Sequence, residues 1–130
     1  IRFVNRQQGS GTRLLLDSLL VAERVLPQRI PGYASEEFTH GAVAAMVASG
    51  VVDAAFGIEA AARQLSLDFV PLARERYFLA VRDDLARERR FTKLLGILRG
   101  RKFKARVAQL PGYDAARCGE AVSLAEALQF

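Results

Sequence analysis

A short run of glycine and hydroxyl residues near the start of the chain could bind a small anion. Gly9, Ser10, Gly11 and Thr12 lie between an apolar, strand-like start and a leucine-rich segment. The glycines permit a sharp turn, and the two hydroxyls stand where a following helix presents unpaired N–H groups. This pattern predicts a site for an anion at a helix N-terminus. The same pattern also fits a loop in which Ser10 or Thr12 only caps the helix, so both interpretations stay open.

Other residues that could support catalysis do not form a convincing set. His40 is the only histidine, and it could act as a base or donate a hydrogen bond to a ligand, although a lone histidine is more often a satisfied, partly buried group. Ser10, His40 and Asp53 could be imagined as a triad, but Gln8 occupies the first glycine position of a Gly-x-Ser-x-Gly elbow. The lysine of a phosphate-binding P-loop is also missing. We therefore expect no catalytic residue, no metal site, no cofactor and no enzymatic activity.

Composition sets limits on the fold and the compartment. The chain has 130 residues, 51% of them hydrophobic, which is enough for one ordinary core. No apolar run approaches the ~18 residues of a membrane span, so we expect no membrane contact. Cys118 is the single cysteine, which weakly favours a reducing, cytoplasmic compartment. Because the first residue is Ile and stands in a strand-like run, we expect the natural protein to be longer.

The positive charge is concentrated in one segment. Ten Lys or Arg residues and three acidic residues lie between Arg82 and Arg106, giving +7, so the rest of the chain sums to −2 for a net charge of +5. Such a patch could face nucleic acid or an acidic partner. Because the aromatic residues of this segment form no pattern that suggests base stacking, a solvated helical surface is the simpler interpretation.

Apolar periodicity and turn residues predict alternating strands and helices. Helices are expected over 12–25, 40–49, 58–65 and from Phe91 to Gly100, with a second short one over 103–110 and a final helix or frayed tail over 123–130. Strands are expected at 1–5, within 33–39, and at 51–56, 68–72 and 77–81. This order is typical of an α/β fold with a layered, mostly parallel or mixed sheet and helices on both faces. In such sheets ligands bind beyond the carboxyl ends of strands, where the loops at Thr12 and Gly57 are expected.

The order of these motifs resembles the periplasmic-binding-protein-like domain of the type II fold, found in bacterial transcriptional regulators and attached to molybdopterin-biosynthesis proteins. The likeness is carried by residues 3–13 (FVNRQQGSGTR), 39–40, 42–44, 50–57, 68–72, 75–77 and 110–114. Proteins of this fold have two α/β lobes with a ligand cleft between them. The resemblance implies that residues 1–82 form the second lobe and that residues 83–130 form a helical segment that would return to the missing first lobe.

The resemblance also implies a ligand and a set of contacts. Relatives bind molybdate, tungstate or other small ligands through hydroxyls and backbone amides of the glycine loop. By position, Ser10, Gly11 and Thr12 would contact the ligand, with Arg13 as a further candidate and Thr39 and Gly57 as loop positions facing the same cleft. The chain departs from a plain oxyanion site at Glu59, whose carboxylate would repel an anion if it pointed inward.

These observations predict a ligand-sensing or substrate-binding domain that closes on a small anion, either a molybdate-like or tungstate-like oxyanion or a small carboxylate. The alternative is a domain of a molybdenum-cofactor biosynthesis enzyme. In this family an attached N-terminal domain, in some members DNA-binding, would read the closure. The apolar stripe of Phe91, Leu94, Leu95 and Leu98 would lack its covering lobe, so we expect a homo-oligomer.

Overall fold

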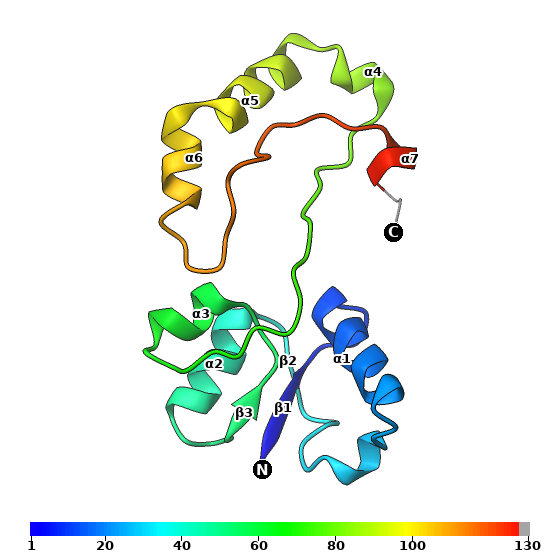
Figure 1. The fold of residues 1–130 in the computed structure, drawn as a ribbon, viewed down its shortest axis with the longest axis vertical. Helices are drawn as coiled ribbons and strands as arrows, with labels where there is room; N and C mark the ends of the chain where they lie inside the picture. Colours follow the sequence, from blue (N-terminus) through cyan, green and yellow to red (C-terminus); the bar gives the residue numbers. More distant parts are fainter. Residues whose placement is uncertain (128–130) are drawn as a thin grey trace. The chain divides into compact units, whose positions relative to one another are not determined.

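The protein is described by a computed structural model, which defines the structure of residues 1–127 (Figure 1). By internal contacts the chain divides into two compact units, Ile1–Leu72 and Ala73–Phe130. The first unit is an α/β structure, and the second is helical. These units are defined by contacts within each part of the chain. The boundary at residue 82, between a second lobe and a segment that returns to the first lobe, stays a prediction.

A small parallel sheet organises the first unit. Its strands are β1 (Phe3–Arg6), β2 (Glu36–Glu37) and β3 (Ala54–Ala55), in the order β2-β1-β3. Arg6 is in register with Glu37 and Val4 with Ala55, and both pairings are parallel. Because β1 has a neighbour on each side, its residues Val4, Asn5 and Arg6 are all buried. The predicted α/β class with a parallel sheet is therefore confirmed.

Each strand is followed by a helix. The helices are α1 (Gly11–Ala22) after β1, α2 (His40–Ala48) after β2 and α3 (Glu59–Gln64) after β3, with a single 3₁₀ turn, η1 (Pro27–Arg29), between α1 and β2. After η1 the chain must pass close to β1. Gly32, at φ +90°, permits this approach, because a Cβ there would lie 1.9 Å from the carbonyl oxygen of Phe3.

The core of this unit forms where α2 packs on the sheet. Val4, Val43 and Val52 are its buried centre, and Met46, Val47 and Ala55 pack against it. Burying one valine side chain contributes roughly 1.5–3 kcal/mol. The buried amide of Asn5 is satisfied, since its Nδ2 donates to the carbonyl of Tyr33 and its Oδ1 accepts from the Arg6 amide. This core fixes the end of β1, and with it the start of the glycine loop.

The second unit consists of short helices joined by exposed segments. They are α4 (Asp83–Ala86), α5 (Arg89–Arg99), α6 (Arg101–Val107) and α7 (Leu124–Ala127). Gly100 ends α5 as predicted. Between residues 73 and 127, the described part of this unit, no residue is fully buried. Across residues 1–127, none of the helices is both long enough and apolar enough to cross a bilayer.

Two predicted strands are absent. Residues 67–82 contain neither strand nor helix, so the prediction of strands at 68–72 and 77–81 is wrong. Both stretches are rich in β-forming residues, but a strand exists only when another strand completes its hydrogen bonds, and Pro71 removes one donor. Within the described chain the sheet therefore has three strands. Of the final helix predicted over 123–130, α7 is present, and residues 128–130 lie outside the described part of the chain.

Candidate functional site

Three strand-to-helix loops meet at one edge of the sheet. Because β1, β2 and β3 are parallel, their carboxyl ends lie together, and α1, α2 and α3 begin there (Figure 1). Ser10, Gly11, Thr12 and Arg13 start α1. Thr39 precedes α2 and Gly57 precedes α3. The fold thus brings all three predicted loops to the same side of the unit.

Ser10 is the N-cap of α1, and its hydroxyl caps this helix as one of the two interpretations predicted. Its hydroxyl accepts a hydrogen bond from the Arg13 amide at 3.2 Å and donates a hydrogen bond to the Gln7 carbonyl at 2.9 Å. A hydroxyl has only one proton to donate. In this arrangement Ser10 therefore has no proton left for an anion.

Thr12 differs from Ser10 in this respect. It is half-buried, and its hydroxyl makes no hydrogen bond to any residue in the range 1–127. The backbone amides of Gly11 and Thr12 likewise have no acceptor within that range, as expected for the first turn of a helix. The backbone turns into this helix at Gly9, which adopts φ +80°. Unused donors at the start of α1 therefore come from Gly11 and Thr12.

The predicted positions on the other two loops have distinct environments. Thr39 caps α2, accepting from the Ala42 amide at 3.0 Å, and is itself exposed. Gly57 is half-buried beside His40, and a Cβ on it would lie 3.8 Å from the imidazole Nδ1. The carboxylate of Glu59 is paired along α3 with Arg63, N···O 3.3 Å, so its negative charge is partly offset.

Arg13 is 6% exposed and its charge is compensated inside the fold. Its guanidinium contacts the carboxylates of Asp17 and Glu36, both at 3.1 Å, and lies 4.3 Å from the ring centroid of Tyr33. Tyr33 in turn donates to Asp17 at 2.6 Å. Burial alone would lower the pKa of Arg13, but its interactions with Tyr33 and Asp17 outweigh burial and raise it. Arg13 therefore joins α1, β2 and the intervening loop.

Arg6, at the carboxyl end of β1, is equally buried at 7% exposed but is not compensated. Its Nε and Nη2 donate to the Gln7 side chain and to the carbonyls of Glu37 and Phe38. No carboxylate among residues 1–127 forms an ion pair with it. Its Nη1 is closed off from solvent and has no hydrogen-bond partner there. A buried cation without an anion is costly.

His40, the first residue of α2, has the second unpartnered nitrogen at this edge. Its Nδ1 is buried without a hydrogen-bond partner in the described chain, although the ring as a whole is half-buried. Burial, and secondarily the positive charge of Arg6, lower the pKa of His40 below its usual value of about 6.5. The expectation that this histidine is a satisfied polar group is therefore wrong for Nδ1.

Sequence reasoning did not select Arg6, although it stands in the motif on which the resemblance rests. The one available signal was a charged residue directly after the strand expected at 1–5, where the glycine loop begins. Nothing in the sequence shows which of Arg6 and Arg13 obtains a carboxylate.

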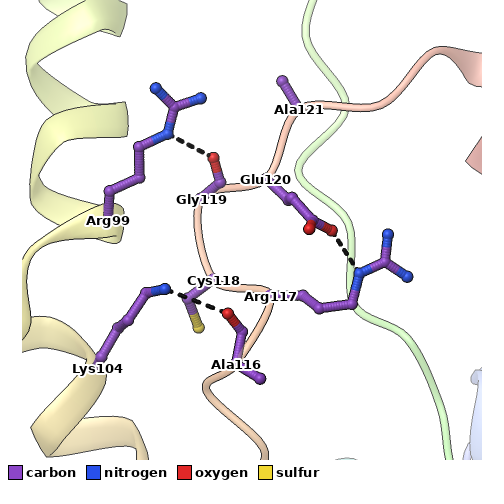
Figure 2. Close-up of a pocket in the computed structure, with 8 residues that line it drawn as sticks. All are labelled: Arg99, Lys104, Ala116, Arg117, Cys118, Gly119, Glu120 and Ala121. Carbon is purple, nitrogen blue, oxygen red and sulfur yellow. Dashed lines mark hydrogen bonds and ion pairs between the residues drawn. The ribbon is translucent and has the colours of Figure 1, made fainter.

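A hollow in the second unit has a different character (Figure 2). It lies between α5, α6 and the loop at 116–121, and its cations are occupied: Arg99 donates to the Gly119 carbonyl at 2.8 Å and Lys104 to that of Ala116 at 3.2 Å. Arg117 is paired with Glu120. These contacts hold the loop against the helices. Among the described residues, no cluster of three or more His, Cys, Asp or Glu is arranged to hold a metal.

Comparison with known proteins agrees with this architecture. The family model of the PBP superfamily domain matches residues 1–99. The uncharacterized protein YvgK of Bacillus subtilis (strain 168) is 37% identical over 123 residues, which cover 94% of this chain but 39% of that protein. The "uncharacterized protein in ferredoxin 2Fe-2S gene 5'region" of Clostridium pasteurianum is 36% identical over 111 residues, covering 85% of this chain and 98% of that protein. No solved structure matches significantly. The chain therefore belongs to the PBP superfamily, the periplasmic-binding-protein-like domains.

Proposed function

We propose that the chain is a non-enzymatic binding lobe that closes on a small anion, either a molybdate-like or tungstate-like oxyanion or a small carboxylate. Membership of a binding-protein superfamily supports a binding role. The chain spans 39% of the Bacillus relative, so this proposal concerns the lobe and its ligand.

The observation that carries the proposal is the uncompensated guanidinium of Arg6. It is 7% exposed, has an unpartnered Nη1 and lies where β1 ends. An anion at this edge would provide the missing negative charge and the missing acceptor, and hydrogen bonds between charged groups contribute roughly 1.5–3 kcal/mol each. Arg13, which lies in the first turn of α1, obtains two carboxylates instead.

The start of α1 supplies further donors for the same ligand. The unused amides of Gly11 and Thr12 and the unused Thr12 hydroxyl all stand at this helix N-terminus, where the helix dipole also favours negative charge. Thr39 and Gly57 border the site from the other two loops. Ser10 shapes the loop by capping α1, and Arg13 holds the loop on β2.

We place this lobe in a type II binding protein with a layered sheet. Residues 1–82 would form the second lobe and residues 83–130 the segment that returns to the first. Ligand binding would favour the closed arrangement of the lobes. An attached N-terminal domain, of DNA-binding or another type, would read that change in a cytoplasmic homo-oligomer.

A thermal-shift screen of the full chain tests the proposal. The ligands are molybdate, tungstate, sulfate, phosphate, acetate and formate, and a ligand at a hundred times its dissociation constant should stabilise the protein by roughly 2.7 kcal/mol. Arg6→Met, with a roughly thirtyfold lower affinity, should reduce this stabilisation to about 0.9 kcal/mol at the same ligand concentration. Arg29→Gln, which removes the same charge from an exposed position in the same unit, should leave it unchanged. The absence of any shift, or an equal shift for Arg6→Met, would overturn the proposal.

A further inference from the structure

Arg6 and His40 form a pair of unsatisfied groups at the same sheet edge. Arg6 Nη1 and His40 Nδ1 are both buried and both lack a hydrogen-bond partner among residues 1–127. The two side chains are close enough for the charge of Arg6 to act on the imidazole. Arg6 Nη2 also donates to the Phe38 carbonyl, two residues before His40, at 2.9 Å. A single ligand lying between the two side chains would satisfy both orphaned atoms.

We propose that His40 is a second ligand contact, and that Arg6 and His40 together hold a doubly charged oxyanion. This inference rests on the proposed function and specifies the charge of its ligand. A singly charged carboxylate would offset Arg6 but would bring no second charge to balance an imidazolium at His40. A dianion carries a second negative charge, which an imidazolium at His40 would balance.

Proton uptake by His40 follows from this arrangement. In the free protein, burial and Arg6 lower the pKa of His40, so the ring is neutral at pH 7. A bound dianion would neutralise Arg6, favour the imidazolium and raise the pKa of His40. Nδ1 would then donate to an oxyanion oxygen, as Nη1 of Arg6 does. Affinity should therefore rise as the pH falls from the higher pKa of the complex towards the lower pKa of the free protein.

Other charged groups near α2 are few. Among the elements that pack against α2, β1 carries Arg6, β3 carries no charged residue, and α3 carries the Glu59–Arg63 pair. β2 carries Glu36, which is bound to Arg13, and Glu37. Glu37 is the remaining carboxylate that could stabilise an imidazolium without a ligand, yet the pKa of His40 is lowered.

The His40 ring can reorient to meet a ligand. It makes no hydrogen bond to any described residue, so its rotation breaks none. Gly57 leaves room beside it, because a methyl group there would come within 3.8 Å of Nδ1 and 3.7 Å of Val43 Cγ2. These are ordinary van der Waals distances, so Gly57→Ala would retain the fold while filling the space next to Nδ1.

A nuclear magnetic resonance titration of the untagged full chain tests this directly, because His40 is the only histidine and its ring signals are unambiguous. Without ligand, its pKa should lie below about 6.5. Saturating sulfate or molybdate should raise it by roughly one unit or more, while acetate and formate, which offset only Arg6, should raise it less. Calorimetric titration in buffers of different ionisation enthalpy should show proton uptake at pH 7.

Variants distinguish a failure of the role proposed for His40 from a failure of the anion site itself. His40→Asn should weaken sulfate or molybdate binding about tenfold and abolish proton uptake, and Gly57→Ala should weaken it in the same direction. If dianions bind only when Arg6 is present, but with equal affinity and equal proton uptake in His40→Asn, the role of His40 is wrong and the anion site stands. The role of His40 is also wrong if only carboxylates bind. If no anion binds, or if Arg6→Met binds normally, both proposals are overturned.

Discussion

Two buried arginines seven residues apart, Arg6 and Arg13, flank the glycine loop and have opposite environments. Arg13 is 6% exposed and contacts two carboxylates and a tyrosine ring. Arg6 is 7% exposed and contacts carbonyl and amide oxygens only, with Nη1 unpartnered among the described residues. Burial by itself therefore does not distinguish a structural cation from the binding cation that we propose. The charge balance around each arginine does, because a compensated charge stabilises the fold whereas an uncompensated one is available to an external anion.

The largest expected effect is a loss of stability when Arg13, the arginine with two carboxylate partners, is replaced. Arg13→Met should lower the free energy of unfolding by about 3 kcal/mol, because Asp17 and Glu36 lose their cation, although both carboxylates reach solvent. Urea unfolding at pH 7 measures this, with Arg29→Gln as the charge-matched control. A loss below about 1 kcal/mol would show that the Arg13 network adds little to stability.

Arg6→Met should show the reverse pattern. It removes an uncompensated buried charge and takes the Arg6 donor from the Phe38 carbonyl and from the half-buried Gln7 side-chain oxygen, so stability should change by less than about 1 kcal/mol. Anion affinity should fall roughly thirtyfold, which corresponds to about 2 kcal/mol. Urea unfolding and calorimetric titration give the two values. If Arg6→Met destabilises the fold as much as Arg13→Met, the contrast between the two residues disappears.

Thr12 tests whether a loop hydroxyl without an internal partner contributes to anion binding. Because its hydroxyl has no hydrogen-bond partner in the described chain, Thr12→Val should leave the melting temperature unchanged and weaken anion binding about tenfold. Titration of the variant with the anion that gives the largest thermal shift measures the effect. Unchanged affinity would remove Thr12 from the site.

Ser10→Ala should have a smaller effect than Thr12→Val and a different one, because it should lower stability and not anion affinity. Loss of the cap on α1 should reduce stability by about 1 kcal/mol. Anion affinity should stay close to that of the original chain, because the Ser10 proton is donated to Gln7. A tenfold loss of affinity with unchanged stability would reverse the roles assigned to Ser10 and Thr12.

The smallest effect concerns an exposed pair at the amino end of the sheet, Arg2 and Asp53. The side-chain and backbone hydrogen bonds from Arg2 lower the pKa of Asp53 to about 2, from an ordinary value of 3.8. A lowered folded-state pKa stabilises the fold above pH 3.8, and this contribution is lost as the pH falls towards 2. Asp53→Asn should therefore be slightly less stable than the original chain at pH 7 and equally stable at pH 2. Because both side chains are exposed, high salt should reduce the difference.

Local patterns predicted the helices of the first unit well. Apolar spacing located α1 and α2 within a few residues, and a hydroxyl cap was also predicted for α1, because a helix is specified by residues three or four apart and by its own ends. The same reasoning failed at residues 68–72 and 77–81. A strand depends on a neighbouring strand that is distant in sequence, and β-forming residues cannot supply that neighbour.

The sequence by itself determined the glycine loop and the helix that follows it, because these depend on residues within one short segment. It also determined the family, because the family's motifs follow one another in order along much of the chain. Only the tertiary structure decided which loop residues have free donors and which arginine lacks a counter-charge. Glu36 reaches Arg13 across 23 residues and the Phe38 carbonyl reaches Arg6 across 32. Such partners are set by the pairing of β1 with β2, since electrostatic compensation depends on distance in space rather than on separation along the chain.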